Sequence, residues 1–333
     1  MRHRARTWGI VILGGMVLWI AAHYWLRKPY RLIDLGTLGG PGSTAYALND
    51  KGQVVGMADT LDGHTHAFLW KEGRMIDLGT LGGAGSCAFG VNSLGLVVGS
   101  AEFLGHQAHA FLWQQGRMQD LGTLGGEEST AFAIDEAGQI VGSAQLPNGE
   151  THACLWERGH IHNLGTLGGN YSVARAINPY GHIVGWSKTW RGETHAFLYV
   201  GGRLRDLGTL GGKDSEACAI NAGDEIVGAA DTPNGSRHAF RYTRGRMEDS
   251  HPAQALSSAA WAINDAGVVV GTSQNLYIED GVWLAGGKTQ RMSSLLTERR
   301  IDAETPLAIN NNNAIVATSY TRDQTSALLL TWR

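Results

Sequence analysis

The chain has few cysteines, three among 333 residues. Their number is odd, and they fall in strand-like segments of different sequence repeats, at Cys87, Cys154 and Cys218. We therefore expect neither a disulfide framework nor a metal site. Cys154 stands where the corresponding segments have phenylalanine, which predicts a small, buried apolar side chain.

Positive charge is scarce beyond the N-terminal segment. Residues 1–31 hold six Lys and Arg residues and no carboxylate, so the rest of the chain carries 21 basic and 30 acidic side chains and a formal charge of −9. A protein that binds nucleic acid usually has the opposite balance. We therefore expect no nucleic-acid partner.

Known catalytic signatures are absent as well. No serine lies in a G-x-S-x-G elbow, and the GTLGG segments lead into predicted strands, whereas a phosphate-binding loop opens a helix. The neighbouring Glu127 and Glu128 could do glycosidase chemistry, but adjacent carboxylates in a loop are usually only solvated. The sequence therefore indicates no catalytic residue and no cofactor and favours a non-enzymatic role, with a hydrolase or lyase acting on an extracellular polymer as the alternative.

The sequence does contain a repeat. DLGTLGG occurs at 34–40, 77–83, 120–126 and 206–212, NLGTLGG occurs at 163–169, and each step is 43 residues. An Asn or Asp follows fifteen residues after the start of each copy. A His-Ala pair follows at 32 residues in five of them, with Phe after it in four and Cys154 in the fifth. Such a period is typical of one supersecondary unit used many times. We count seven units, near residues 34–76, 77–119, 120–162, 163–205, 206–248, 249–293 and 294–333.

Each unit has the pattern of four short strands. In the third unit they are predicted at 130–135, 139–144, 152–157 and 160–164, separated by Asn/Asp-x-x-Gly and X-Gly turns. Residues 66–70 are apolar on both faces, as expected of a sheet packed between two others. This pattern predicts the blade of a β-propeller.

The two ends of the repeat region complement each other. A strand-like segment at 30–35 precedes the first unit, and the last unit stops after its third strand. We therefore predict an all-β, seven-bladed β-propeller of four-stranded blades, whose ring is closed by pairing the N-terminal strand with the C-terminal three.

A membrane anchor is predicted before the propeller. Residues 8–26 are apolar except for His23 and are long enough to span a bilayer. A cleavable signal peptide is the alternative, but Ala21 and Ala22 do not follow an A-x-A pattern. We expect residues 1–28 to be a transmembrane helix that acts as an anchor or uncleaved signal. Residues 29–333 would then form a propeller in the periplasm or at the cell surface, or a secreted one if the N-terminus is cleaved.

The His-Ala-Phe segments, such as 66–68, together with DLGTLGG and Ala-x-x-Ile-Asn, resemble the HAF-type extracellular repeat family. The likeness is clear over about residues 34–248 and weaker beyond. It implies an exported, propeller-like protein and brings no established activity or catalytic residue with it.

Residues that recur in register from unit to unit are predicted to belong to the scaffold. A residue needed once per blade more often holds the blade together than forms a site, and a ring of seven-fold spacing does not bring histidines to one metal ion. We assign this structural role to His66, His109, His152, His195, His238, Asp34, Asp77, Asp120 and Asp206.

Function is sought instead where the copies differ. The loops after the second and fourth strands of a blade emerge on one face, and their sequences are unlike one another. Exposed aromatic and charged residues there can anchor a protein or stack on a sugar. The candidate binding residues are Phe103, Glu127, Glu128, Tyr171, Trp190, Arg191, Lys213 and Tyr277. The predicted partners are a protein or glycan, and the membrane through the N-terminal helix; a structural or adhesive envelope protein is a further alternative.

Overall fold

The computed structural model describes residues 30–103, 105, 107–252, 255–274, 279–284, 288–290, 304–320 and 324–332. The helix expected at 1–28 and the candidate Tyr277 lie outside these residues. Within the part of the chain that the structure describes, no helix has the length and apolarity needed to cross a membrane.

All regular elements of the described residues are β-strands, in accord with the predicted all-β class. Two four-stranded sheets come first in the chain: β2 (Gly39–Leu48), β3 (Val54–Thr60), β4 (Thr65–Lys71) and β5 (Arg74–Asp77), then β6 (Ser86–Val91), β7 (Val97–Glu102), β8 (Ala108–Gln114) and β9 (Arg117–Asp120). An eight-stranded sheet follows: β10 (Ser129–Ile134), β11 (Ile140–Gln145), β12 (Thr151–Glu157), β13 (His160–Gly165), β14 (Gly168–Ile177), β15 (Ile183–Thr189), β16 (Thr194–Val200) and β17 (Arg203–Asp206). Its two halves are joined by a single parallel pair, Thr151 with Tyr171.

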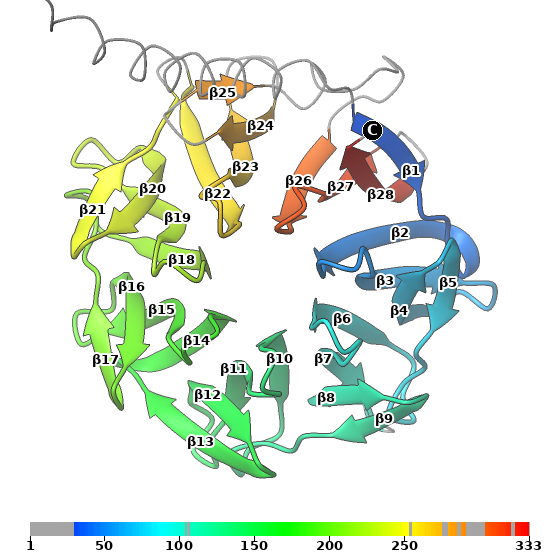
Figure 1. The fold of residues 1–333 in the computed structure, drawn as a ribbon. Coiled ribbons are helices and arrows are strands. Elements are labelled where there is room, and N and C mark those ends of the chain that lie inside the picture. The colour runs from blue at the N-terminus through cyan, green and yellow to red at the C-terminus, as the bar shows by residue number, and fades with distance from the viewer. Residues whose placement is uncertain are drawn as a thin grey trace, which may run out of the picture.

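Two more sheets complete the order along the chain: β18 (Ser215–Ile220), β19 (Ile226–Asp231), β20 (Arg237–Thr243) and β21 (Arg246–Asp249), then β22 (Ser257–Ile263), β23 (Val269–Gln274), β24 (Glu279–Leu284) and β25 (Lys288–Gln290). A final sheet combines both ends of the chain, with the order β1 (Tyr30–Asp34), β28 (Thr325–Trp332), β27 (Ile315–Tyr320) and β26 (Glu304–Ile309). β1 and β28 are antiparallel, from Tyr30 opposite Trp332 to Asp34 opposite Leu328. The sheets succeed one another around a central axis, in the arrangement of a β-propeller (Figure 1).

The predicted strands of the third unit agree with β10 to β13 to within one residue at each end. Turn chemistry explains this agreement. The tight turns between third and fourth strands place both central residues in the left-handed region, for example Arg158 at φ 51° and Gly159 at φ 78°. Such a turn matches the twist of an antiparallel pair.

The two faces of β4 pack against different sheets. Ala67 and Leu69 belong to a buried cluster with residues of β6 and β7, whereas Phe68 lies in a cluster with residues of β27 and β28. Phe68 is completely buried. The two-sided apolar pattern of the HAF segment thus follows from stacking between sheets. Cys154 takes the place of this phenylalanine in β12 and is buried, as predicted.

Side-chain amides link successive sheets near the axis. Six of the seven turns between first and second strands begin with an asparagine whose Nδ2 donates to the backbone carbonyl of the equivalent residue in the next repeat around the axis. The bonds are Asn49 to Asn92 (2.8 Å), Asn92 to Asp135 (3.0 Å), Asn178 to Asn221 (3.2 Å), Asn221 to Asn264 (3.1 Å), Asn264 to Asn310 (3.1 Å) and Asn310 to Asn49 (2.9 Å). We call these residues the asparagine series. Asp135 is its one member without an amide, and the last bond joins residues 261 positions apart.

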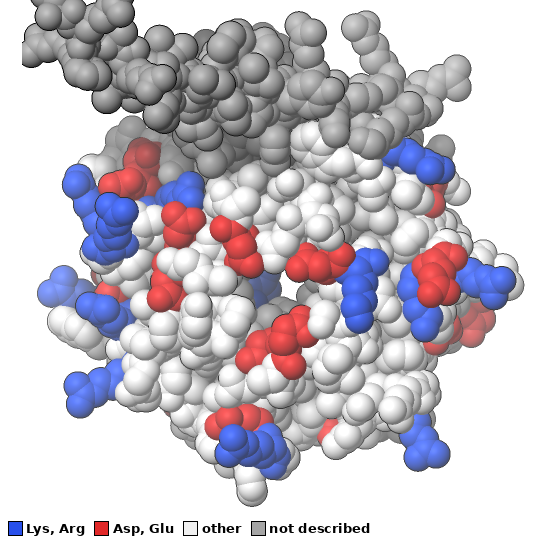
Figure 2. All heavy atoms as spheres, viewed as in Figure 1, with Lys and Arg blue, Asp and Glu red and all other residues white. Residues whose placement is uncertain are grey.

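Acidic side chains gather around a hollow at the centre of the face seen in Figure 2. Carboxylates next to the asparagine series accept hydrogen bonds from the neighbouring turn. Glu136 accepts from the Ser93 amide at 2.9 Å, and Asp50 accepts from the Asn311 amide at 2.8 Å. These carboxylates therefore connect adjacent sheets.

Candidate functional site

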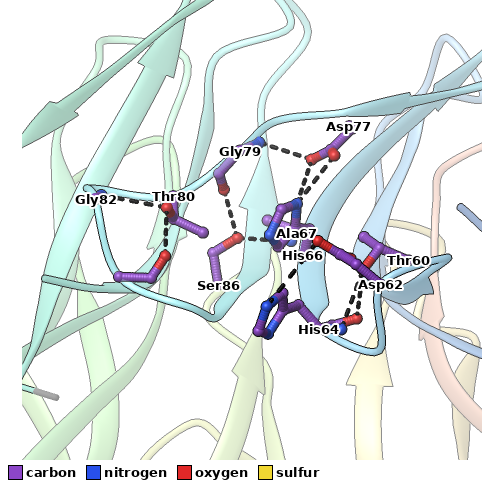
Figure 3. Close-up of polar contacts among 11 residues, drawn as sticks. Thr60, Asp62, His64, His66, Ala67, Asp77, Gly79, Thr80, Gly82 and Ser86 are labelled. Atoms are coloured by element: carbon purple, nitrogen blue, oxygen red, sulfur yellow. Dashed lines mark hydrogen bonds and ion pairs between the residues drawn. The ribbon is translucent and has the colours of Figure 1, made fainter. Parts of the chain in front are cut away.

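The repeated histidine and aspartate lie together on neighbouring strands of one sheet. His66 on β4 places Nδ1 2.9 Å from a carboxylate oxygen of Asp77, where β5 ends (Figure 3). The same carboxylate accepts a hydrogen bond from the Gly79 amide at 2.8 Å. This pair fixes the start of the DLGTLGG linker.

The repeated serine ties that linker to the next sheet. Ser86 Oγ on β6 accepts the Ala67 amide at 2.8 Å and donates to the Gly79 carbonyl at 2.6 Å (Figure 3). Both partners are backbone groups, Ala67 in the preceding repeat and Gly79 in the linker. The serine thus holds three segments together through hydrogen bonds to backbone groups.

Later repeats keep this geometry. The histidine Nδ1 atoms lie 2.8 to 3.0 Å from the nearest side-chain oxygen of the residue eleven positions on: His109 with Asp120, His152 with Asn163, His195 with Asp206 and His238 with Asp249. Asp34 accepts the Gly36 amide at 2.9 Å, as Asp77 does for Gly79. Within the described residues, no group of three or more His, Cys, Asp or Glu side chains could hold a metal ion.

The linkers and the turns after second strands lie side by side, as the sequence pattern predicted. The Gly83 amide donates to the carbonyl of Glu102 at the end of β7, and the Glu102 amide donates back to Gly85, both at 2.9 Å. Equivalent bonds join Gly126 to Gln145 and Gly212 to Asp231. We call the surface formed by these linkers and turns the loop face.

The loop face carries an exposed aromatic group on one sheet. Tyr171 on β14 stacks on Trp186 of β15, with ring centroids 5.3 Å apart and planes at 10°. Trp190, in the turn after β15, is 73 % exposed, and Arg191 lies over its ring at 4.7 Å from the centroid. We call Tyr171, Trp186, Trp190 and Arg191 the aromatic group.

The other candidates lie elsewhere on the loop face. Phe103, in the turn after β7, packs edge-on against His109 at 4.7 Å between ring centroids. Glu127, Glu128 and Lys213 are exposed in the linkers that precede β10 and β18. Glu127 makes its hydrogen bonds through backbone atoms: its amide donates to the Gln145 side chain, and its carbonyl contacts His109 Nε2. The structure therefore pairs Tyr171 with Trp186 and Trp190 with Arg191. Among the described residues, no hydrogen bond, ion pair or ring contact joins the other candidates to these pairs.

Sequence reasoning missed a second set of unit-specific residues, which lines the central channel. Each first strand has an irregular register at one residue: Ala45 lies opposite Gly56 and Ala47 opposite Val55, so Tyr46 is an extra residue. A β-bulge of this kind redirects a side chain. The equivalent residues line a cavity of about 410 Å³ and include four aromatic side chains, a cation, a thiol and an aliphatic side chain: Tyr46, Phe89, Phe132, Arg175, Cys218, Trp261 and Leu307. Their variation three positions before the asparagine series was the available signal.

Comparisons with known proteins show the fold. No family model matches the sequence, and no curated protein matches it. The chain is similar to a puromycin-hydrolysing peptidase from Mycobacterium tuberculosis (TM-score 0.59, 13 % identity, 92 % of this chain and 51 % of that chain). It is also similar to the β-propeller domain of the Trilobed protease from Pyrococcus furiosus, described as having an open velcro topology (TM-score 0.57, 10 % identity, 87 % and 93 %).

A third similar structure is TolB from Acinetobacter baumannii (TM-score 0.51, 10 % identity, 86 % and 65 %). The chain therefore spans about half of the peptidase and two thirds of TolB. At these identities the likeness shows a β-propeller fold alone.

Proposed function

We propose that this chain is a non-catalytic binding module that holds a protein or glycan on its loop face. The observation that carries the proposal is the aromatic group. Trp190 exposes 73 % and Tyr171 40 % of their surface, in positions that other repeats fill with residues such as Pro233 and Asp214. Aromatic rings beside an arginine are the residues that most often dominate binding energy at interfaces, and flat rings also stack on sugars.

The proposal includes the architecture around this surface. The seven groups of four strands would be seven blades, and the pairing of β1 with β28 would close them into a ring. The bond from Asn310 to Asn49 and the seating of the Ala327 amide on Ser43 at 3.0 Å support this closure. The N-terminal apolar segment would anchor the propeller outside the cytoplasm, in keeping with the resemblance to HAF-type repeats.

Catalysis on an extracellular polymer is the competing function. In the part of the chain that the structure describes, the carboxylates and histidines that the sequence suggested for this role do not form a catalytic pair. Glu127 and Glu128 are exposed side chains of one linker, and the repeated His–Asp pairs are committed to turns. Turnover of a polysaccharide by the purified protein would favour this alternative over binding alone.

The test is binding of the full chain, in detergent, to a glycan array and to candidate envelope proteins. The double variant Tyr171→Ala/Trp190→Ala should lose about 2 kcal/mol or more of binding free energy, as is usual when interface hot spots are truncated. The matched control is Tyr180→Ala, because Tyr180 is 69 % exposed but lies in the turn between β14 and β15, away from the loop face. Equal binding by all three proteins would refute the loop-face assignment.

A further inference from the structure

The channel residues vary from repeat to repeat, whereas the residues directly before and after them are almost always alanine. The bulged residue in each first strand is flanked by small residues, such as Ala174 and Ala176 around Arg175, and every copy has the same register shift. The fold therefore presents one freely variable side chain per repeat to the axis. A lining position that varies between two small neighbours can be adapted to a ligand without disturbing the sheet.

The lining is aromatic on one side. The rings of Tyr46 and Phe89 lie 5.3 Å apart, as do those of Phe89 and Phe132, with tilted planes. Trp261 lies on the opposite part of the lining and donates from Nε1 to Thr272 at 3.2 Å. A cavity of about 410 Å³ with mostly apolar walls and few polar groups has the size and character of a small-molecule site.

Arg175 is the one charged residue of this lining. Its guanidinium carbon lies 4.6 Å from the centroid of the Phe132 ring. Arg237 and Arg241 form ion pairs with Glu216 and Glu225, whereas no carboxylate of the described residues lies within 4.0 Å of Arg175. Burial raises the pKa of Cys218 to about 11, so this thiol adds no negative charge at neutral pH.

We propose that the central channel binds a small organic carboxylate with a flat apolar body, held by Arg175 and stacked among Phe89, Phe132 and Trp261. The guanidinium offers a planar pair of donors that fits a carboxylate, and a stacked guanidinium keeps its N–H groups free at the ring edge. The aromatic rings take the apolar body out of water. This site is separate from the aromatic group of the loop face and does not depend on it.

The carboxylates near the asparagine series act against an anion at long range. Glu136, Asp50 and Asp265 follow the inner strands and accept hydrogen bonds from neighbouring turns. Their charges are exposed to water and screened within about 8 to 10 Å at physiological salt, whereas contact with Arg175 is direct. A cationic ligand would gain from these carboxylates but would meet Arg175 inside the cavity. A preference for anionic ligands therefore indicates that Arg175 dominates, and a preference for cationic ligands indicates that the carboxylates dominate.

Calorimetric titration of the full chain in nanodiscs, with empty nanodiscs subtracted, tests the proposal with three probes of one shape: 2-naphthoate, 2-naphthamide and 2-naphthylmethylammonium. We expect saturable binding of naphthoate, weaker binding of the amide and the weakest binding of the ammonium compound. Arg175→Gln should weaken naphthoate about tenfold or more and the amide less than about twofold, as expected for loss of a charge-assisted hydrogen bond. Arg205→Gln, which removes an exposed charge on β17, should change neither.

Phe89→Leu keeps the charge and reduces stacking, so it should weaken naphthoate and the amide by similar factors. Circular dichroism of each variant shows whether it folds, and the Phe89 variant keeps the test valid if Arg175→Gln does not. Three results would each overturn the proposal. They are absence of saturable naphthoate binding, tighter binding of the ammonium probe than of naphthoate, and a folded Arg175→Gln variant that prefers naphthoate over the amide as strongly as the parent does.

Discussion

Replacing Asp135 with asparagine should stabilise the protein. Asp135 is the member of the asparagine series that lacks an amide, and it is only 8 % exposed. Its Oδ1 accepts the Gln139 amide at 2.8 Å, a bond that asparagine can keep. The new Nδ2 would donate to the Asn178 carbonyl, as Asn92 Nδ2 donates to that of Asp135.

The magnitude follows from one added bond and one removed charge. A side-chain hydrogen bond contributes about 0.5 to 1.5 kcal/mol net. An unfolding entropy of about 2.1 cal/mol/K per residue converts 1 kcal/mol into about 1.5 °C for a chain of this length. Burial also raises the pKa of Asp135, so its ionised form costs further stability at neutral pH.

This pKa shift sets the pH dependence. A carboxyl whose pKa is higher in the folded state destabilises the fold once it is ionised, and that cost vanishes when the carboxyl is protonated in both states. The Tm advantage of Asp135→Asn should therefore be largest at neutral pH. It should shrink as the pH falls through the raised pKa toward the usual pKa of an aspartate, where a protonated Asp135 can itself donate.

The assay is thermal unfolding followed by circular dichroism at several pH values. Asn92→Asp is the matched control, because it removes one observed bond from the same series and should lower the Tm. An Asp135→Asn variant that is less stable than the parent at pH 7, or one whose advantage grows in acid, would refute the reasoning.

Two further predictions concern links between repeats. Ser172→Ala leaves the buried Ala153 amide without its acceptor at 2.7 Å and should lower the free energy of unfolding, measured by chemical denaturation, by about 1 to 3 kcal/mol. The control is Ser93→Ala, which removes an exposed bond to Glu136 and should cost less than about 0.5 kcal/mol. Similar losses in the two variants would contradict this. Deleting residues 325–333 removes β28, exposes the edges of β1 and β27, and should lower the Tm and promote aggregation, measured by scattering; a truncated chain as stable as the parent would argue against a closed ring.

Much of the fold was predictable because each unit marks its turns. The Asn-x-x-Gly and X-Gly signals place the strand ends, and two-sided apolar segments such as 66–70 predict stacking between sheets. The bond between Asn310 and Asn49 was not predictable, since recurrence alone does not show that an asparagine reaches the next repeat.

The site was only partly predictable for a related reason. Exposed loop residues such as Trp190 are apparent from sequence because they depart from the pattern of the other copies. Arg175 lies inside a strand, and strict alternation of faces does not predict that a bulge directs it to the axis. The stacking of Tyr171 on Trp186 depends on the register of β14 and β15, which the sequence did not specify.

The central claim is that unit-specific residues bind the partner while repeated residues hold the scaffold. It is tested most directly within one sheet, by comparing the double variant Tyr171→Ala/Trp190→Ala with the single variant His195→Ala. The Nδ1 atom of His195 lies 2.8 Å from Asp206. Partner affinity and Tm are measured on the same preparations. We predict that the double aromatic variant loses affinity at an unchanged Tm, whereas the histidine variant keeps its affinity at a lower Tm. Loss of affinity in His195→Ala at an unchanged Tm, with binding intact in the aromatic variant, would contradict the claim.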